Sequence, residues 1–131
     1  MTIDSYDPNI APDPASWLAL GDDERRTLVE AWHATLQAEM PNIPVHAMMH
    51  VIVENQVAEG DALPVQRKVR QLMAQGLDRH DAIHAVASVL MHHFHALMTR
   101  DETGKAAGSD QNQRYFSALG RLNARKWLRS G

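Results

Sequence analysis

Apolar side chains recur along most of the chain at intervals of three and four residues, the period that places them on one face of an α-helix. The first such stripe contains Leu28, Val29, Trp32 and Leu36, in a helix that we expect to begin after the capping residue Asp22. Proline near the start and glycine near the end mark the limits of later helices. The pattern predicts about five helices, at residues 23–36, 44–59, 64–75, 79–98 and 111–128.

Two segments lack this pattern. Residues 1–16 combine three prolines with Asp and Asn, so we expect a Pro-rich N-terminal arm that lies on the surface and adds no side chain to the core. Residues 99–110 are small and charged, which predicts a loop. Residues 17–131 are expected to form one domain, because a chain of 131 residues can bury roughly two thirds of its unfolded surface. The predicted fold class is all-α, a single-domain helical bundle.

Histidines recur at a spacing of four in two of the predicted helices. The second helix contains His46 and His50, and the fourth contains His80 and His84. Residues four apart lie one turn apart on a helix, so each pair can point at one object. Neutral imidazoles in this arrangement suit Zn²⁺ or a similar divalent ion, and two such helices supply four ligands. The spacing therefore predicts a divalent metal site, with Zn²⁺ as the first candidate.

The expected topology brings the two pairs together. If successive helices run up and down, the second and fourth helices are parallel, and His46 and His80 lie in the first turn of each. His50 and His84 then meet one turn higher. Glu54 continues the stripe of the second helix and is a candidate fifth ligand, hydrogen-bond acceptor or general base acting on metal-bound water. Metal-assisted hydrolysis is the chemistry that this set would support.

A structural interpretation remains open beside the metal site. The histidines could form a buried polar core without an ion, in a non-catalytic interaction domain that forms a homodimer. His33 lies next to the first apolar stripe and is interpreted as an amphipathic histidine rather than a ligand. Neither interpretation names a substrate, which leaves open whether the protein is an enzyme.

Charge and composition narrow the possibilities further. Residues 1–61 carry eleven Asp and Glu against two Arg, whereas residues 62–131 carry eleven Lys and Arg against five acids, so the two halves should attract each other. A net charge of −3 makes nucleic acid an improbable partner despite the basic C-terminal half. The absence of cysteine excludes disulfides and thiolate ligands. Without an apolar run of membrane-spanning length or a basic leader, a cytoplasmic location is expected.

The segments HAMMHVIVENQVAEGD and GLDRHDAIHAVASVL resemble the two signatures of a family of small bacterial helical proteins catalogued as domain of unknown function 1841. Those signatures consist of a His-x3-His segment that leads to a Gln and a second His-x3-His segment. The resemblance covers about residues 44–98 and carries over His46, His50, Gln56, His80 and His84. It implies a helical fold and a shared site but no reaction, and it does not cover the Pro-rich arm or the 99–110 loop.

Overall fold

The computed structural model describes residues 3–34, 43–99 and 109–130, and within these residues all regular structure is helical. The all-α prediction is therefore confirmed. The elements are α1 (Pro14–Ala19), α2 (Asp22–Ala34), α3 (Ile43–Ala58), the 3-10 turn η1 (Gly60–Ala62), α4 (Val65–Ala74), α5 (Arg79–Thr99), α6 (Ser109–Arg121) and α7 (Ala124–Ser130). Leu36 and most of the predicted 99–110 loop lie outside the described residues.

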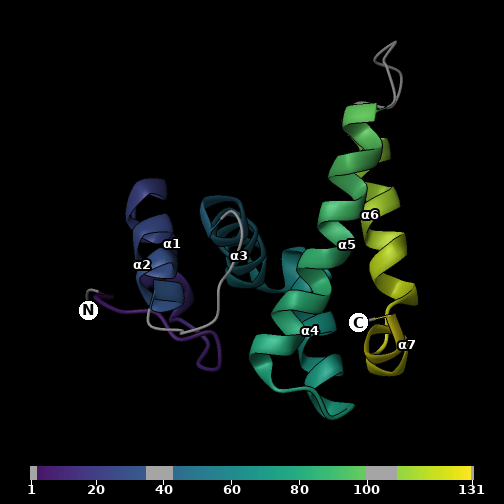
Figure 1. The fold of residues 1–131 in the computed structure, drawn as a ribbon, viewed down its shortest axis with the longest axis horizontal. Helices are drawn as coiled ribbons and strands as arrows, with labels where there is room; N and C mark the ends of the chain where they lie inside the picture. The colour runs from purple at the N-terminus through teal and green to yellow at the C-terminus, as the bar shows by residue number, and fades with distance from the viewer. Residues whose placement is uncertain (1–2, 35–42, 100–108, 131) are drawn as a thin grey trace.

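Helix α3 lies between two groups of helices and packs against both (Figure 1). On one side, Ala47 and Val51 of α3 join a small core with Tyr6, Trp17 and Val29 from the N-terminal segment, α1 and α2. On the other side, α3 contributes to the larger core built around α5. The histidine helix α3 is thus held on both faces, and the side chains that it directs between the two cores are fixed in position.

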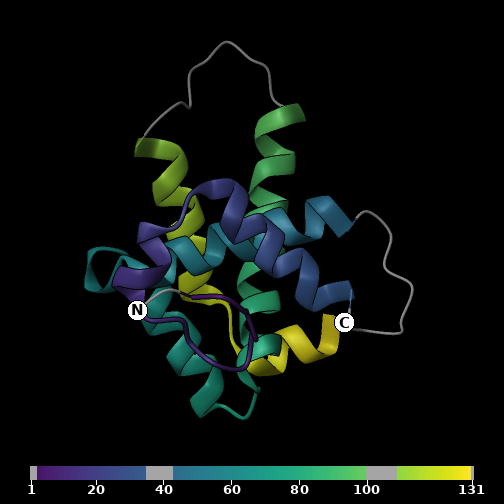
Figure 2. The ribbon, with the colours of Figure 1, turned by 90° about the vertical axis from the view of Figure 1, so that its left-hand side faces the viewer.

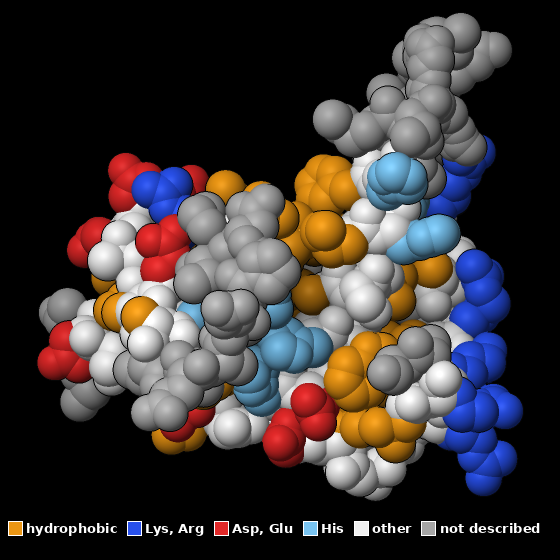
Figure 3. Space-filling view, in the orientation of Figure 1, with side chains coloured by type: hydrophobic (Ala, Val, Ile, Leu, Met, Phe, Trp, Pro, Cys, Tyr) orange, Lys and Arg blue, Asp and Glu red, His pale blue; other side chains and the backbone are white. Residues whose placement is uncertain are grey.

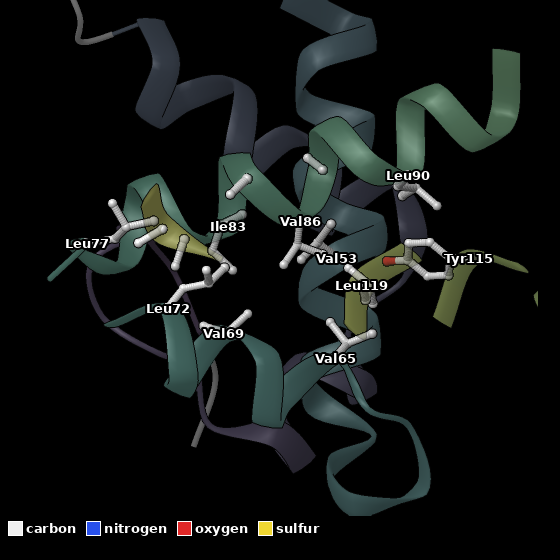
Figure 4. Packing of buried hydrophobic residues seen from close by; sticks show 14 residues of the cluster. Val53, Val65, Val69, Leu72, Leu77, Ile83, Val86, Leu90, Tyr115 and Leu119 are labelled. Carbon is white, nitrogen blue, oxygen red and sulfur yellow. The ribbon is translucent and has the colours of Figure 1, made fainter. Parts of the chain in front are cut away.

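Helix α5 is the centre of the larger core, as its almost continuous apolar sequence predicts. Its buried side chains include Ile83, Val86 and Leu90, which face α4 below them and α6 beside them (Figure 4). Val53 of α3 reaches the same cluster. This packing fixes one face of α5 and leaves the histidines near its N-terminal end facing α3.

The end of α4 and the start of α5 lie at the glycine and the capping residue that the sequence predicts. Gly76 adopts a φ of 111° just after α4, a conformation that other residues rarely tolerate, and its N–H donates to the carbonyl of Met73 over 3.0 Å. Asp78 caps α5, because its carboxylate accepts the N–H of Asp81 over 2.8 Å. The predicted turn and cap are confirmed. They place Arg79 and His80 in the first turn of α5.

The expectation that the N-terminal arm at residues 1–16 adds no side chain to the core is wrong. Tyr6 and Pro8 are buried, and Asp13 and Pro14 start helix α1 as its cap and first residue. Trp17 of α1 is fully buried, and its indole N–H donates to Asn55 of α3 over 2.9 Å. Figure 2 shows the N-terminal segment crossing the molecule in front of the helices. Prolines exclude a long helix here but do not prevent an extended segment from packing.

The predicted fifth helix is two helices. Asn123 interrupts it, because its side-chain carbonyl accepts the N–H of Lys126 over 2.8 Å and so caps a new helix, α7. Gln75 accepts the N–H of Ala124 over 2.8 Å, and the buried ammonium of Lys68 donates to the carbonyl of Leu122 over 2.8 Å. Contacts from α4 therefore satisfy the backbone groups that the break exposes.

The opposite charges of the N-terminal and C-terminal halves of the chain seldom pair with each other. Most of the acidic side chains seen in Figure 3 lie on the side of α1 and α2, with a second group at the lower middle, and most of the basic ones line the opposite edge. Within the described residues, the pair Glu54 and Arg79 is the one ion pair that joins the halves. None of the helices in the described part of the chain combines the length and apolar character that crossing a membrane requires.

Candidate metal centre

Four imidazoles converge where α2, α3 and α5 meet. His33, His50, His80 and His84 each offer a ring nitrogen, and these four atoms all lie within 4.8 Å of one another. His46 stands beside them, with its Nε2 atom 3.1 Å from Nε2 of His84. Three of the four predicted ligands are therefore in the set, His33 takes the fourth place, and His46 lies at its edge.

The predicted topology required the two histidine helices, α3 and α5, to run parallel. In the structure they do not. Glu54 meets Arg79 at the start of α5, whereas His46 and His50 meet His84 one turn later. Residue numbers therefore fall along α3 as they rise along α5, and the two helices cross at a steep angle (Figures 1 and 4). The predicted matched heights are wrong. The histidines still converge because α3 crosses α5 at its first two turns.

His33 and His80 each carry a ring nitrogen that is shielded from solvent. Nδ1 of His33 donates to the carbonyl of Val29 over 2.8 Å, which fixes the neutral ring with its lone pair on Nε2. Nε2 of His33 and Nε2 of His80 are both buried without a hydrogen-bond partner. Trp32 packs edge-on against both rings, with centroid distances of 5.0 and 4.9 Å. Buried ring nitrogens without a partner are costly unless a further group reaches them.

His50 is oriented by a chain of hydrogen bonds behind it. The Tyr6 hydroxyl donates to Oε2 of Glu54 over 2.7 Å, which uses its single proton. The same hydroxyl oxygen lies 3.2 Å from Nδ1 of His50 and therefore accepts the Nδ1–H of that ring. His50 is thus held in the tautomer whose Nε2 lone pair faces the other imidazoles. Metal-ligating histidines characteristically make such a hydrogen bond through their other nitrogen.

Glu54 does not stand free as a base. Its side chain is 1% exposed, and its two oxygen atoms each accept a hydrogen bond of 2.8 Å from the Arg79 guanidinium. Arg79 also donates to the carbonyl of Pro8 over 2.9 Å. Burial acts to lower the pKa of Arg79, but the hydrogen bonds and charge of Glu54 outweigh it and raise that pKa. Glu54 therefore supports Tyr6 and, through it, His50.

Hydrogen bonds alone do not account for both close contacts that Nε2 of His84 makes with other ring nitrogens. Its Nε2 lies 3.0 Å from Nε2 of His50 and 3.1 Å from Nε2 of His46. Because Nε2 of His50 carries a lone pair, one N–H on His84 could serve only one of its two neighbours. Two nitrogens bound to one tetrahedral ion at 2.0–2.1 Å would lie about 3.3 Å apart, close to the 3.0 Å between Nε2 of His50 and Nε2 of His84. This pair of ring nitrogens therefore fits a shared cation better than a shared proton.

Burial favours the neutral form of four imidazoles, those of His46, His50, His80 and His84. Loss of solvent lowers the pKa of His50 to about 2 and that of His84 to about 4, and repulsion between the rings adds to both effects. The pKa values of His46 and His80 are lowered for the same reasons. Burial, followed by the Glu54 charge, raises the pKa of Tyr6 and keeps its hydroxyl protonated. Neutral rings are the form that binds metal.

A groove of about 460 Å³ opens beside the cluster, and His46, His50 and His84 are among the residues that line it. Histidine side chains reach the surface in the middle of the molecule, next to hydrophobic side chains (Figure 3). The centre is therefore buried on the His33 side and open to the groove on the His46 side.

His33, Tyr6 and Arg79 are the members of this site that the sequence pattern missed. For His33 a signal was present, because it follows the buried Val29 by four residues and so shares its face of α2. Tyr6 is the one aromatic residue of the Pro-rich segment, and Arg79 separates the cap Asp78 from His80, but neither position reveals a partner in another segment.

Comparison with known proteins adds nothing to this geometry, since no family model, curated protein or solved structure matches the chain. The resemblance to domain of unknown function 1841 stays a prediction. The site must be interpreted from its own residues.

The lowered pKa values predict an acid-sensitive metal-free protein. Between pH 6.5 and 5 the unfolded chain takes up protons on His50 and His84 that the folded protein does not, so stability falls as the pH falls. Each such group contributes a slope of up to about 1.4 kcal/mol per pH unit. Urea unfolding in EDTA across this range measures the slope, and His84→Asn should reduce it. A profile that is flat from pH 6.5 to 5 would contradict this description of the rings.

Proposed function

We propose that the protein binds one divalent metal ion, Zn²⁺ in the first instance, through His33, His50, His80 and His84. The observation that carries the proposal is that two buried Nε2 atoms of one histidine cluster, on His33 and His80, have no hydrogen-bond partner within the described part of the chain, where the one other such atom, on His93, lies outside the cluster. Imidazole nitrogen suits Zn²⁺, Cu²⁺ and Ni²⁺, and Zn²⁺ is the one of these that characteristically takes four ligands in a tetrahedron.

A polar core without an ion explains these residues less well. Each buried nitrogen that lacks a partner costs about 1–3 kcal/mol, and the cluster contains at least two. Protonating the rings is no remedy, because neighbouring imidazolium charges repel one another in a site with little solvent. A cation bound by the lone pairs removes both costs at once.

The role of Glu54 follows from its partners. A general base must present a free carboxylate oxygen to metal-bound water, but both oxygens of Glu54 already accept hydrogen bonds from Arg79. Glu54 is better explained as a positioning residue that acts on His50 through Tyr6. The function that the geometry supports best is therefore metal binding, rather than hydrolysis with Glu54 as the base.

Metal content tests the proposal directly. Protein expressed without a His-tag and purified at pH 7.5 should hold close to one ion per chain by inductively coupled plasma mass spectrometry. His84→Ala removes a proposed ligand and should weaken Zn²⁺ binding by more than about tenfold, whereas His92→Ala changes an exposed histidine of the same helix and should not. If wild-type protein holds no metal and its melting temperature ignores Zn²⁺ and EDTA, the polar-core interpretation replaces this one.

The hydrogen bond behind His50 gives a finer test. Tyr6→Phe keeps the buried ring but removes the acceptor for the His50 Nδ1–H, so Zn²⁺ affinity should fall about 10- to 100-fold. Tyr115→Phe is the matched control, because it also removes a buried hydroxyl, one that donates to Gln56 over 2.7 Å, without touching the proposed ligands. Competition with a chromogenic chelator measures both affinities. Equal losses in the two variants would mean that Tyr6 acts through general stability alone.

A further inference from the structure

The groove beside the histidines has apolar walls. The apolar side chains that line it are Val45 and Met49 from α3 and Ala87 and Met91 from α5. Val45 and Met91 are 42% and 43% exposed, so the apolar wall of the groove is open to a bound group. Flexible methionine side chains adapt to bound groups of different shape. The volume of about 460 Å³ falls within the range of roughly 300–1,000 Å³ that is typical of small-molecule sites.

The charge of the proposed centre determines what the groove should hold. Four neutral imidazoles leave a divalent ion with its full charge, and no acidic residue from the described parts of the chain lines the groove. The nearest buried carboxylate, Glu54, is already neutralised by Arg79. Asp78 acts electrostatically on His80 and His84, as do Asp7 and Asp81 on His80, but none of the three lines the groove. A partly buried positive centre of this kind favours an anionic ligand at its open side.

We infer that the groove binds a small organic carboxylate, with its charged head at the His46, His50 and His84 end and its apolar body between Met49 and Met91. This inference rests on the proposed metal centre and names the ligand class of that centre. His46 supports it independently, because its half-buried ring lies outside the group of four imidazoles and lines the groove beside His84, where its N–H can donate to a carboxylate oxygen.

The test uses the full chain loaded with Co²⁺, whose visible absorption reports a change of ligands. Butyrate should change the spectrum in a saturable way and bind roughly tenfold more tightly than acetate, because each additional buried methylene contributes about fourfold. Butanol has the same apolar body without the charge and should leave the spectrum unchanged.

Two variants locate the ligand. Met91→Glu places a negative charge on the groove wall and should weaken butyrate binding on the order of tenfold. Phe94→Glu is the matched control, since Phe94 lies on the same helix and is 41% exposed but does not line the groove, and it should bind butyrate like wild type. Met91→Lys changes the same position with the opposite charge and should bind butyrate at least as tightly as wild type. Circular dichroism and Co²⁺ content confirm that each variant is folded and loaded.

The outcomes separate the two proposals. If wild-type protein fails to retain Co²⁺, the metal centre itself is refuted and this inference falls with it. If Co²⁺ is retained but butyrate changes nothing, or acetate and butyrate bind equally, the metal centre stands and the carboxylate groove is overturned. Equal weakening by Met91→Glu and Phe94→Glu would also overturn it, because the effect would then be one of overall charge.

Discussion

The buried ion pair between Glu54 and Arg79 holds the site together. It joins the last turns of α3 to the first turn of α5, and the same two side chains reach Tyr6 and the carbonyl of Pro8 in the N-terminal segment. Desolvating two charges is costly, and removing either partner would leave the other buried and unpaired, at a cost of about 3–5 kcal/mol. This constraint fixes where α3 crosses α5, and therefore which turns of the two helices face each other.

The histidines depend on that crossing. With Glu54 against Arg79, the preceding turn of α3 brings His50 to His84. Helix α2 adds His33 from the other side of α3. The result is a group of ring nitrogens crowded together away from solvent, a costly arrangement for a protein that has no cation to place there. A cation at the centre of the cluster would give the buried nitrogens a partner, and the rings themselves would stay uncharged. The extended support from Arg79 through Glu54 and Tyr6 to His50 then has a clear purpose, because it fixes one tautomer.

Sequence patterns correctly predicted the features that depend on residues close together in the chain. The turn at Gly76, the cap at Asp78 and the repeated His-x3-His spacing each involve residues a few positions apart, and they gave the limits of α4 and α5 and most of the histidine cluster. The site residues that were missed have partners far away in sequence. Tyr6 contacts residues 44 and 48 positions later, and Arg79 contacts a carbonyl 71 positions earlier. No periodicity encodes such contacts, and the parallel arrangement assumed for α3 and α5 was wrong for the same reason.

X-ray absorption at the zinc edge tests the central claim most directly, because it reports the atoms around the ion itself. For protein loaded with one equivalent of Zn²⁺, we expect a first shell of nitrogen or oxygen atoms at about 2.0–2.1 Å, with the outer-shell scattering of several imidazole rings. His33→Ala should reduce that imidazole contribution by one ring, since His33 belongs to the proposed ligand set. An oxygen-only shell, or a spectrum that His33→Ala leaves unchanged, would contradict a metal centre built by α2, α3 and α5.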